Sequence, residues 1–500
     1  MRITKFVTEK RIEKLKTYGI YLLILFITWA CMLRNSFNCD TLTHKLWPVD
    51  DAIGAIEWGR YIRGGLDYIL AVVGINLADR PGITVFIGLL FVAAALTILD
   101  EVVRQDFQFG EKNWIVYVIL ALPFCNVLFS ENWMFGECAI GCYGIGYLFA
   151  ALAIRAFIRE KYVKALILLL VSTCAYQAGV IYAGLMITGY LFIKNEYRLT
   201  AKVWIEEAVC LVMTLGAGFL NLKSTNLLYY IGVLKQVQNS PVSGWNVELI
   251  GEKIHLCFSN LCDIYMDSME LLPGKALPIF VVLFCLAITV VLLVKEKNYL
   301  GVLYYLLVII AGHLFLYVLP FLNNYTYCYP RIMFGVYAIW SIMFLTALEL
   351  TIKSKINFVR NAVLAVGLGF ALINFLYIQA IVQEHMISNN QDLIFAQIVY
   401  EKMLDYEAET GITVKNLVSA GDEDAPRAFD NVGYATYQIN ERAMGMVTTT
   451  LLNIVSGREF NRIYYSEEEY DEIFGSHDYK YFDPETQVFF EGDTLYWLIY

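Results

Sequence analysis

Residues 276–294 read ALPIFVVLFCLAITVVLLV, an apolar stretch without a charged side chain. A helix needs about 20 consecutive apolar residues to cross the roughly 30 Å hydrocarbon core of a bilayer, so this stretch predicts a membrane-spanning helix. Comparable runs recur along most of the chain and predict an all-α polytopic membrane protein. The predicted spans are 18–33, 83–99, 114–130, 138–158, 205–222, 276–294, 299–320, 332–350 and 360–383.

The composition of the 500-residue chain agrees with this class. Apolar residues make up 58% and charged residues 17% of the chain, whereas ordinary globular chains have roughly 45–50% and 25%. These values exclude a disordered chain, a coiled coil and a basic nucleic-acid-binding protein. The 11 cysteines are too sparse for a small disulfide-stabilised scaffold.

One further apolar run, 164–193, is interrupted by Tyr176 and Gln177. Lys and Arg collect on the cytoplasmic side of membrane proteins, so the basic N-terminal segment is expected inside. The basic residues that follow the run, such as Arg198 and Lys202, are inside only if the run crosses the membrane twice. We therefore predict two short helices that meet at the break, about eleven spans, a cytoplasmic N-terminus and a C-terminus outside.

Charge divides the chain into two predicted domains. Residues 385–500 hold 21 Asp and Glu against 7 Lys and Arg, whereas residues 1–384 are slightly basic. We predict a multi-span membrane domain over 1–384 and an acidic, soluble, extracytoplasmic α/β domain over 385–500. Within the latter, the pattern predicts a helix over 391–409, a strand over 412–418 and a terminal hairpin around Gly492.

The predicted topology places the long connections outside, over residues 34–82 and 223–275, and leaves short loops inside. Long loops usually carry function, so we expect the functional site on the outer face.

The first outer loop contains paired carboxylates and several arginines. Asp50 and Asp51 precede a helix-like stretch, and either can serve as a general base for a sugar hydroxyl or simply as a helix N-terminal acid. Arg60, Arg63 and Arg80 lie outside against the positive-inside trend, and a guanidinium matches a phosphate well. The alternative for the arginines is ion pairing with neighbouring acids.

Four more residues are candidate substrate contacts. Glu131 and Trp133 form an acidic aromatic turn that fits sugar recognition, or else an ordinary solvated turn. Gln177 is polar inside an apolar run and must find a partner. Arg331 follows a tyrosine-rich segment, 323–329, at the mouth of a span, where tyrosines also form an interfacial belt.

Neither a metal centre nor a cofactor is predicted. The chain lacks a phosphate-binding glycine loop, and its five His and scattered Cys have no zinc spacing. Cys257 and Cys262 share an outer loop and could pair, although spacing alone does not fix disulfide geometry.

The layout as a whole resembles the phage-type, type II serotype-converting O-antigen glucosyltransferases of the GT-C superfamily. The features are a basic N-terminus and one span before Asp50-Asp51, later Arg80-Pro81, the turn 131–135, the break at Tyr176-Gln177, Pro330-Arg331 before a late span, and a soluble tail that ends in a hairpin.

This resemblance implies an enzyme of the bacterial cytoplasmic membrane. Such an enzyme moves a sugar, glucose in the resembled family, from a polyprenyl-phosphate donor to a cell-surface glycan on the outer face. Asp51 or Asp50 would then be the catalytic base, and the arginines would hold the donor phosphate. The alternatives are a transporter or flippase for a lipid-linked glycan, to which an intramembrane His313 would contribute, and a polysaccharide polymerase. The expected partners are the lipid-linked sugar, the glycan acceptor and membrane lipids, without nucleic acid.

Overall fold

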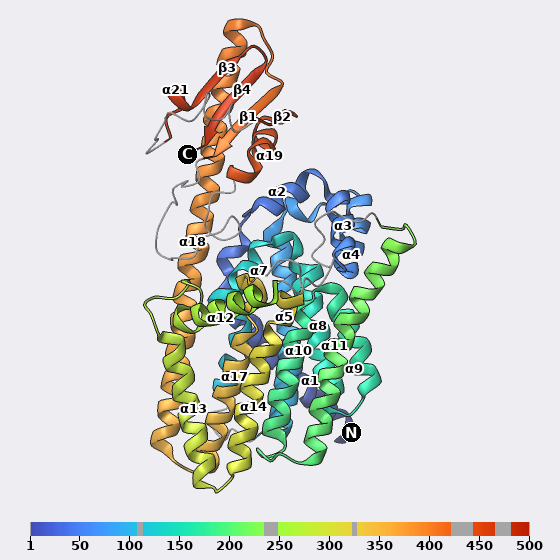
Figure 1. Cartoon of the computed structure of the whole chain (residues 1–500), viewed down its shortest axis with the longest axis vertical. Helices are drawn as coiled ribbons and strands as arrows, with labels where there is room; N and C mark the ends of the chain where they lie inside the picture. The colour runs from blue at the N-terminus through green and yellow to red at the C-terminus, as the bar shows by residue number, and fades with distance from the viewer. Residues whose placement is uncertain are drawn as a thin grey trace.

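The computed structural model describes residues 2–107, 114–234, 249–322, 328–421, 444–465 and 482–499. Figure 1 shows a body of long helices with a small sheet-containing unit beyond one end. The N-terminus lies toward the opposite end of this body (Figure 1). The molecule is therefore elongated along its long helices.

Eight helices in the described ranges are long and apolar enough to cross a bilayer. They are α1 (Arg2–Trp29), α5 (Pro81–Asp106), α8 (Ile145–Ile158, with the turns that lead into it from Gly136), α11 (Ala201–Tyr230), α13 (Leu277–Lys295), α14 (Tyr299–Leu316), α17 (Val336–Lys353, which follows α16, Pro330–Met333) and α18 (Asn357–Thr410). A bent pair of segments, Trp114–Phe124 with α6 (Trp114–Ala121) and Val127–Met134 with α7 (Ser130–Met134), can form a ninth span, with 45° between the two segments. The membrane body is therefore all-α and polytopic, as predicted.

The run 164–193 forms two helices, α9 (Tyr162–Ala175) and α10 (Ala178–Lys194). Tyr176 has extended backbone angles between them, which confirms the predicted break at Tyr176-Gln177. These helices have only 14 and 17 residues, so they are shorter than the other candidate spans. The total of eleven spans and the orientation of the chain stay predictions.

The first loop folds into three short helices at the end of the body that faces the sheet unit (Figure 1): α2 (Cys39–Leu46), α3 (Pro48–Glu57) and α4 (Tyr61–Val72). Asn38 caps α2 by accepting a hydrogen bond from the Thr41 amide at 2.8 Å. Gly59, with φ of +76°, forms the tight turn between α3 and α4. Asn221 of α11 donates to the Gly59 carbonyl at 2.8 Å and so fixes this turn to the membrane body.

The segment 223–275 is more helical than the predicted outer loop. Helix α11 continues to Tyr230, and α12 (Ile250–Asp267) lies across the direction of the bundle (Figure 1). The reason is that backbone hydrogen bonds inside a helix do not depend on whether the surroundings are lipid or water. Residues 235–248 lie outside the described ranges.

The C-terminal unit contains a four-stranded sheet with the order β2-β1-β4-β3. Its strands are β1 (Asn416–Gly421), β2 (Asn461–Ile463), β3 (Val488–Glu491) and β4 (Thr494–Ile499). β1 pairs in parallel with β2 and β4, and the antiparallel pair β3–β4 is the predicted terminal hairpin. The predicted strand over 412–418 begins later, at Asn416. Among its described residues, the unit also contains the helices α19 (Met444–Ser456) and α21 (Pro484–Gln487).

The C-terminal unit is packed against the first loop rather than separated from it. Cys39 and Leu42 of α2 belong to the same apolar core as Leu451 of α19 and Trp497 of β4. The Phe37 amide also donates to Asn389 of α18 at 2.8 Å. Helix α18 runs through the charge boundary at 384/385 without interruption, so the predicted helix over 391–409 is its distal part.

Candidate functional site

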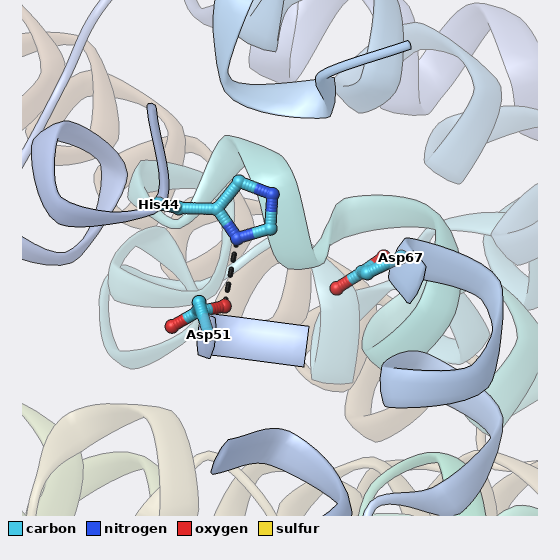
Figure 2. Close-up of side chains that lie close together, drawn as sticks. All are labelled: His44, Asp51 and Asp67. Carbon is cyan, nitrogen blue, oxygen red and sulfur yellow. Dashed lines mark hydrogen bonds and ion pairs between the residues drawn. The ribbon is translucent and has the colours of Figure 1, made fainter. Parts of the chain in front are cut away.

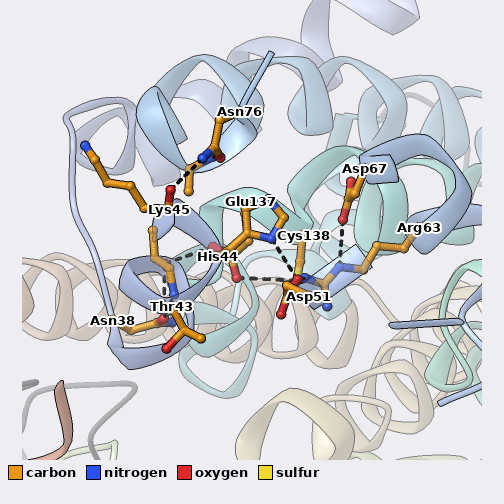
Figure 3. A network of polar contacts seen from close by, with 12 residues as sticks. Asn38, Thr43, His44, Lys45, Asp51, Arg63, Asp67, Asn76, Glu137 and Cys138 are labelled. Atoms are coloured by element: carbon orange, nitrogen blue, oxygen red, sulfur yellow. Dashed lines mark hydrogen bonds and ion pairs between the residues drawn. The ribbon is translucent and has the colours of Figure 1, made fainter. Parts of the chain in front are cut away.

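Asp51, in the first turn of α3, lies at the centre of a polar network on the first loop. Its Oδ2 atom accepts a hydrogen bond from Arg63 Nη2 at 2.5 Å and lies 2.7 Å from His44 Nδ1 (Figures 2 and 3). His44 comes from α2 and Arg63 from α4, so the network joins all three short helices.

Arg63 connects Asp51 to a second, deeper carboxylate. Its Nε atom donates to Asp67 Oδ2 at 3.0 Å, one helical turn further along α4 (Figure 3). Asp67 is 2% exposed, and its Oδ1 atom has no hydrogen-bond partner in the part of the chain that the structure describes. The close approach of α4 to the body requires Gly141, because a Cβ atom there would lie 3.0 Å from the Arg63 Cα.

His44, Asp51 and Asp67 place one ligand atom each within 4.8 Å of one another (Figure 2). Imidazole and carboxylate groups are ordinary ligands of divalent metals. However, Arg63 binds both carboxylates, so a guanidinium already supplies the positive charge that a metal would bring. We therefore interpret the three residues as an ion-pair network.

The network shifts the pKa of Asp51 and of His44 in opposite directions. Burial alone would raise the pKa of Asp51, but the His44 hydrogen bond and the Arg63 charge lower it below its ordinary value. Burial alone would lower the pKa of His44, but its hydrogen bond to Asp51 raises it. Asp51 is therefore held in its ionised form and is a weak base.

Asp40 is a carboxylate that the sequence analysis did not select. It lies in the first turn of α2, its side chain is exposed, and within the described chain it has no hydrogen-bond or ion-pair partner. Although the side chain is accessible, the surrounding protein excludes part of the water around its carboxylate, and this desolvation raises the pKa of Asp40, whereas the nearby charge of Arg331 acts in the opposite direction. The signal in the sequence is that Asp40 is the first acid after the first span and directly follows the helix-capping segment Asn38-Cys39.

Arg60 contacts aromatic rings but has no ion-pair partner among the described residues. Its Nε atom is buried without a hydrogen-bond partner, and its guanidinium forms no ion pair with a described residue. The guanidinium carbon lies 5.5 Å from the centre of the Tyr176 ring and 5.9 Å from that of Trp58. Its charge acts on Asp40 as well as on Asp51.

Arg331, at the start of α16, is held by Glu131 of α7. The Arg331 guanidinium donates to one Glu131 oxygen, and the Arg331 amide donates to the other at 2.8 Å. The guanidinium also lies 4.8 Å from the ring centres of Phe135 and Tyr329. Glu131 is fully buried and engaged in this pair, so in this structure it orients Arg331 and its carboxylate is not accessible to a sugar.

The other predicted site residues have different positions. Trp133 is fully buried among Trp29, Phe129 and Tyr143, so the sugar-stacking role expected for it is not supported. The Gln177 amide finds its partner in the Trp58 carbonyl at 2.8 Å, which ties the break between α9 and α10 to the first loop.

Asp50 and Arg80 are exposed side chains that have no partner within the described residues. Neither takes part in the network of Asp51 and Arg63. The paired carboxylates of the sequence therefore separate in the structure into one buried in the network and one that faces solvent.

Comparisons of the chain with protein-family models, with curated proteins and with solved structures found no match. The resemblance to the O-antigen glucosyltransferases therefore rests on the residues quoted for it and stays a prediction.

Proposed function

We propose that this protein is a GT-C type glycosyltransferase that moves a sugar from a polyprenyl-phosphate donor to a cell-surface glycan on the outer face of the bacterial cytoplasmic membrane. The observation that carries the proposal is the carboxylate of Asp40, which has no partner among the described residues and on which the charges of Arg60 and Arg331 act. A base and cations at one place are what sugar transfer from a phosphate requires.

In the proposed reaction, Asp40 removes the proton from the acceptor hydroxyl as its oxygen attacks the anomeric carbon. The bond between that carbon and the phosphate oxygen breaks, and polyprenyl phosphate leaves with the bonding electrons. Arg60 has an unpartnered buried Nε atom and Arg331 is held in place by Glu131, so both suit the developing negative charge on the phosphate.

Asp40 is a better candidate for the base than Asp51. Partial desolvation raises the pKa of Asp40, and a higher pKa makes a carboxylate a stronger base at neutral pH. The pKa of Asp51 is lowered, and its Oδ2 atom is shared between Arg63 and His44. We assign Asp51 instead to holding α2, α3 and α4 together.

An apolar cavity in the membrane body supports a lipid-linked donor. It has a volume of about 310 Å³ and is bounded by α10, α11, α14 and α17. Gly184, Leu185, Phe315 and Ile339 are among its lining residues. Helix α10, which lines the cavity, begins just after Tyr176, and Tyr176 contacts Arg60. A prenyl chain in the cavity would therefore contact the helix whose start lies near a phosphate bound at Arg60.

The decisive experiment is sugar transfer by the purified protein from polyprenyl-phosphate-glucose to the native glycan. We expect Asp40→Asn to lower the transfer rate by about 10²–10⁴-fold while donor binding persists, because loss of a general base slows the chemical step. Arg60→Gln should weaken donor binding by roughly 10–100-fold, since a hydrogen bond to a charged group contributes about 1.5–3 kcal/mol.

Asp50→Asn is the matched control, because it removes an exposed carboxylate of the same loop. Near-normal transfer by Asp40→Asn, together with a large loss in Asp51→Asn, would return the role of base to Asp51. If the wild-type protein transfers no sugar from this donor under conditions in which it is folded and binds the lipid, the glycosyltransferase proposal is wrong.

Transport of a lipid-linked glycan is the second candidate function. Two polar pairs that involve the apolar helices favour it: Glu207 of α11 with the Tyr304 hydroxyl of α14, and His313 of α14 with the Tyr265 hydroxyl of α12, each at 2.6 Å. Ionisable groups at such depth often serve transport. In liposomes, a flippase would lose lipid translocation in Glu207→Gln or His313→Gln but keep it in Asp40→Asn. A polymerase would instead give products that contain many added sugar units.

A further inference from the structure

We propose that Cys257 of α12 and Cys328, at the entrance to α16, form a reversible disulfide that fastens α12 to the segment leading into Arg331. This disulfide differs from the pairing of Cys257 with Cys262 that the sequence allows. Those two residues lie five positions apart on the same helix, where about 100° of rotation per residue turns them to different faces.

The geometry of α12 brings Cys257 to Cys328. Lys253 donates to the Phe321 carbonyl at 3.2 Å, and Asn260 donates to the Cys328 carbonyl at 3.4 Å. Cys257 lies between these two anchors, one turn after Lys253 and about one turn before Asn260. The thiols of Cys257 and Cys328 lie close enough for each to shift the pKa of the other.

A third contact holds Asn260 in place at this junction. The Tyr317 hydroxyl, which lies just after α14, donates to Asn260 Oδ1 at 2.9 Å. The α12 face that carries the cysteine is therefore fixed to the chain on both sides of residues 323–327. A disulfide here would join elements that already pack together, which limits the rearrangement needed to form it.

The two thiols differ in the way that exchange chemistry requires. The hydrogen bond from Cys328 lowers the pKa of Cys257, while the same contact raises the pKa of Cys328. Both residues are partly exposed, so an oxidant can reach them. Cys257 is thus the attacking thiolate, and Cys328 is the thiol that resolves the mixed disulfide.

The reaction needs a disulfide oxidant, such as oxidised glutathione or a protein dithiol carrier. The Cys257 thiolate attacks one sulfur of the oxidant and releases its other half as a thiolate. The Cys328 sulfur then attacks the Cys257 sulfur of the mixed disulfide, and the second half leaves. The protein loses two electrons and two protons, and the oxidant gains them as two thiols.

The bond would act on the candidate site through a short connection. Cys328 precedes Arg331 by three residues, and the intervening Tyr329 stacks on the Arg331 guanidinium. A covalent link at Cys328 therefore restricts the segment that presents Arg331. This consequence rests on the proposed function, whereas formation of the bond does not.

The test uses the full-length purified protein treated with oxidised glutathione and digested without reduction. Mass spectrometry should find a peptide pair linked through Cys257 and Cys328, with a mass about 2 Da below the sum of the two free peptides. Cys257→Ser and Cys328→Ser should each abolish it. Cys262→Ser, which removes an exposed thiol of the same helix, should leave it unchanged.

A link between Cys257 and Cys262, or two thiols that alkylate fully after oxidation of folded protein, would overturn the proposal. These readings require no enzymatic activity, so they stand apart from the failure of the glycosyltransferase proposal. Donor binding by the oxidised and reduced protein then tests the connection to Arg331, with Cys257→Ser as the variant in which oxidation makes no difference.

Discussion

Arg63 and Arg60 carry the same charge three positions apart, yet the structure predicts opposite consequences of replacing them. Arg63 is 7% exposed and binds two carboxylates, whereas the Arg60 Nε atom is buried without a partner. Arg63→Gln should therefore damage the folded state. Arg60→Gln should leave it nearly intact and weaken donor binding.

The size of the Arg63 effect follows from its two partners. Asp67 is 2% exposed and loses its ion pair with Arg63, and breaking such a buried pair costs about 3–5 kcal/mol. Asp51 has a 25% exposed side chain and keeps His44, so its loss adds about 1 kcal/mol or less. For Arg60, the contacts with Trp58 and Tyr176 are worth about 1 kcal/mol.

Unfolding of the purified protein in detergent, followed by heat or denaturant, measures the difference. The double variant Arg63→Gln/Asp67→Asn should regain part of the lost stability, because it also removes the buried unpaired charge. For residues in direct contact, such coupling amounts to about 0.5–3 kcal/mol. Donor binding to Arg60→Gln and Arg63→Gln is measured on the fraction that remains folded.

The reasoning is refuted if Arg63→Gln unfolds at the wild-type midpoint and binds donor as weakly as Arg60→Gln. Arg63 would then contact the substrate, and the network with Asp51 and Asp67 would not stabilise the first loop. A double variant no more stable than Arg63→Gln would likewise contradict the assigned pairing.

Three other predictions concern pH, packing and topology. Because the folded-state pKa of His44 is raised, the pairing of His44 with Asp51 stabilises the fold fully below about pH 6.5, and this stabilisation is lost as the pH rises through the raised pKa. Because the pKa of Asp51 is lowered, the stabilisation that Asp51 contributes is present above about pH 3.9. The stability gap between wild type and His44→Asn, measured by thermal unfolding, should thus be larger at about pH 5.5 than at pH 9; an unchanged gap would contradict the pairing. Gly141→Ala should destabilise the protein by about 1–3 kcal/mol, because the added Cβ would crowd Arg63. The control Gly65→Ala, whose added Cβ meets no atom within 4 Å, should not destabilise it. Equal effects of the two variants in unfolding experiments would argue against the close approach of α4 to Gly141. In a variant without the exposed Cys31 and Cys262, an impermeant maleimide added to intact cells should label Tyr464→Cys and spare Arg198→Cys. The reverse result would mean that the run 164–193 crosses the membrane only once.

The spans could be predicted from the sequence because their length is set by the bilayer. The run 276–294 matches α13 (Leu277–Lys295) within one residue at each end. The break at Tyr176-Gln177 was also predictable, since a polar amide inside an apolar run must find a partner. That its partner is the Trp58 carbonyl, 119 positions away in the chain, was not.

The end of α18 shows where composition misleads. The chain becomes acidic after residue 384, but the helix continues to Thr410 because its hydrogen bonds lie within the helix itself. The composition of a helix indicates whether lipid or water surrounds it, whereas backbone hydrogen bonding determines where the helix ends.

The sequence by itself determined the membrane class, the approximate spans, the paired helices α9 and α10 and the terminal hairpin, because each depends on neighbouring residues alone. It also supplied the acids and arginines from which a site can be built. Only the tertiary structure decided which of them are available. The turn at Gly59 folds α4 back so that Arg63 binds Asp51, and α7 meets α16 so that Glu131 binds Arg331. Asp40 and Arg60 have no such partner among the described residues. The sequence could not show this difference, because an ion pair depends on distances in space that sequence separation does not encode.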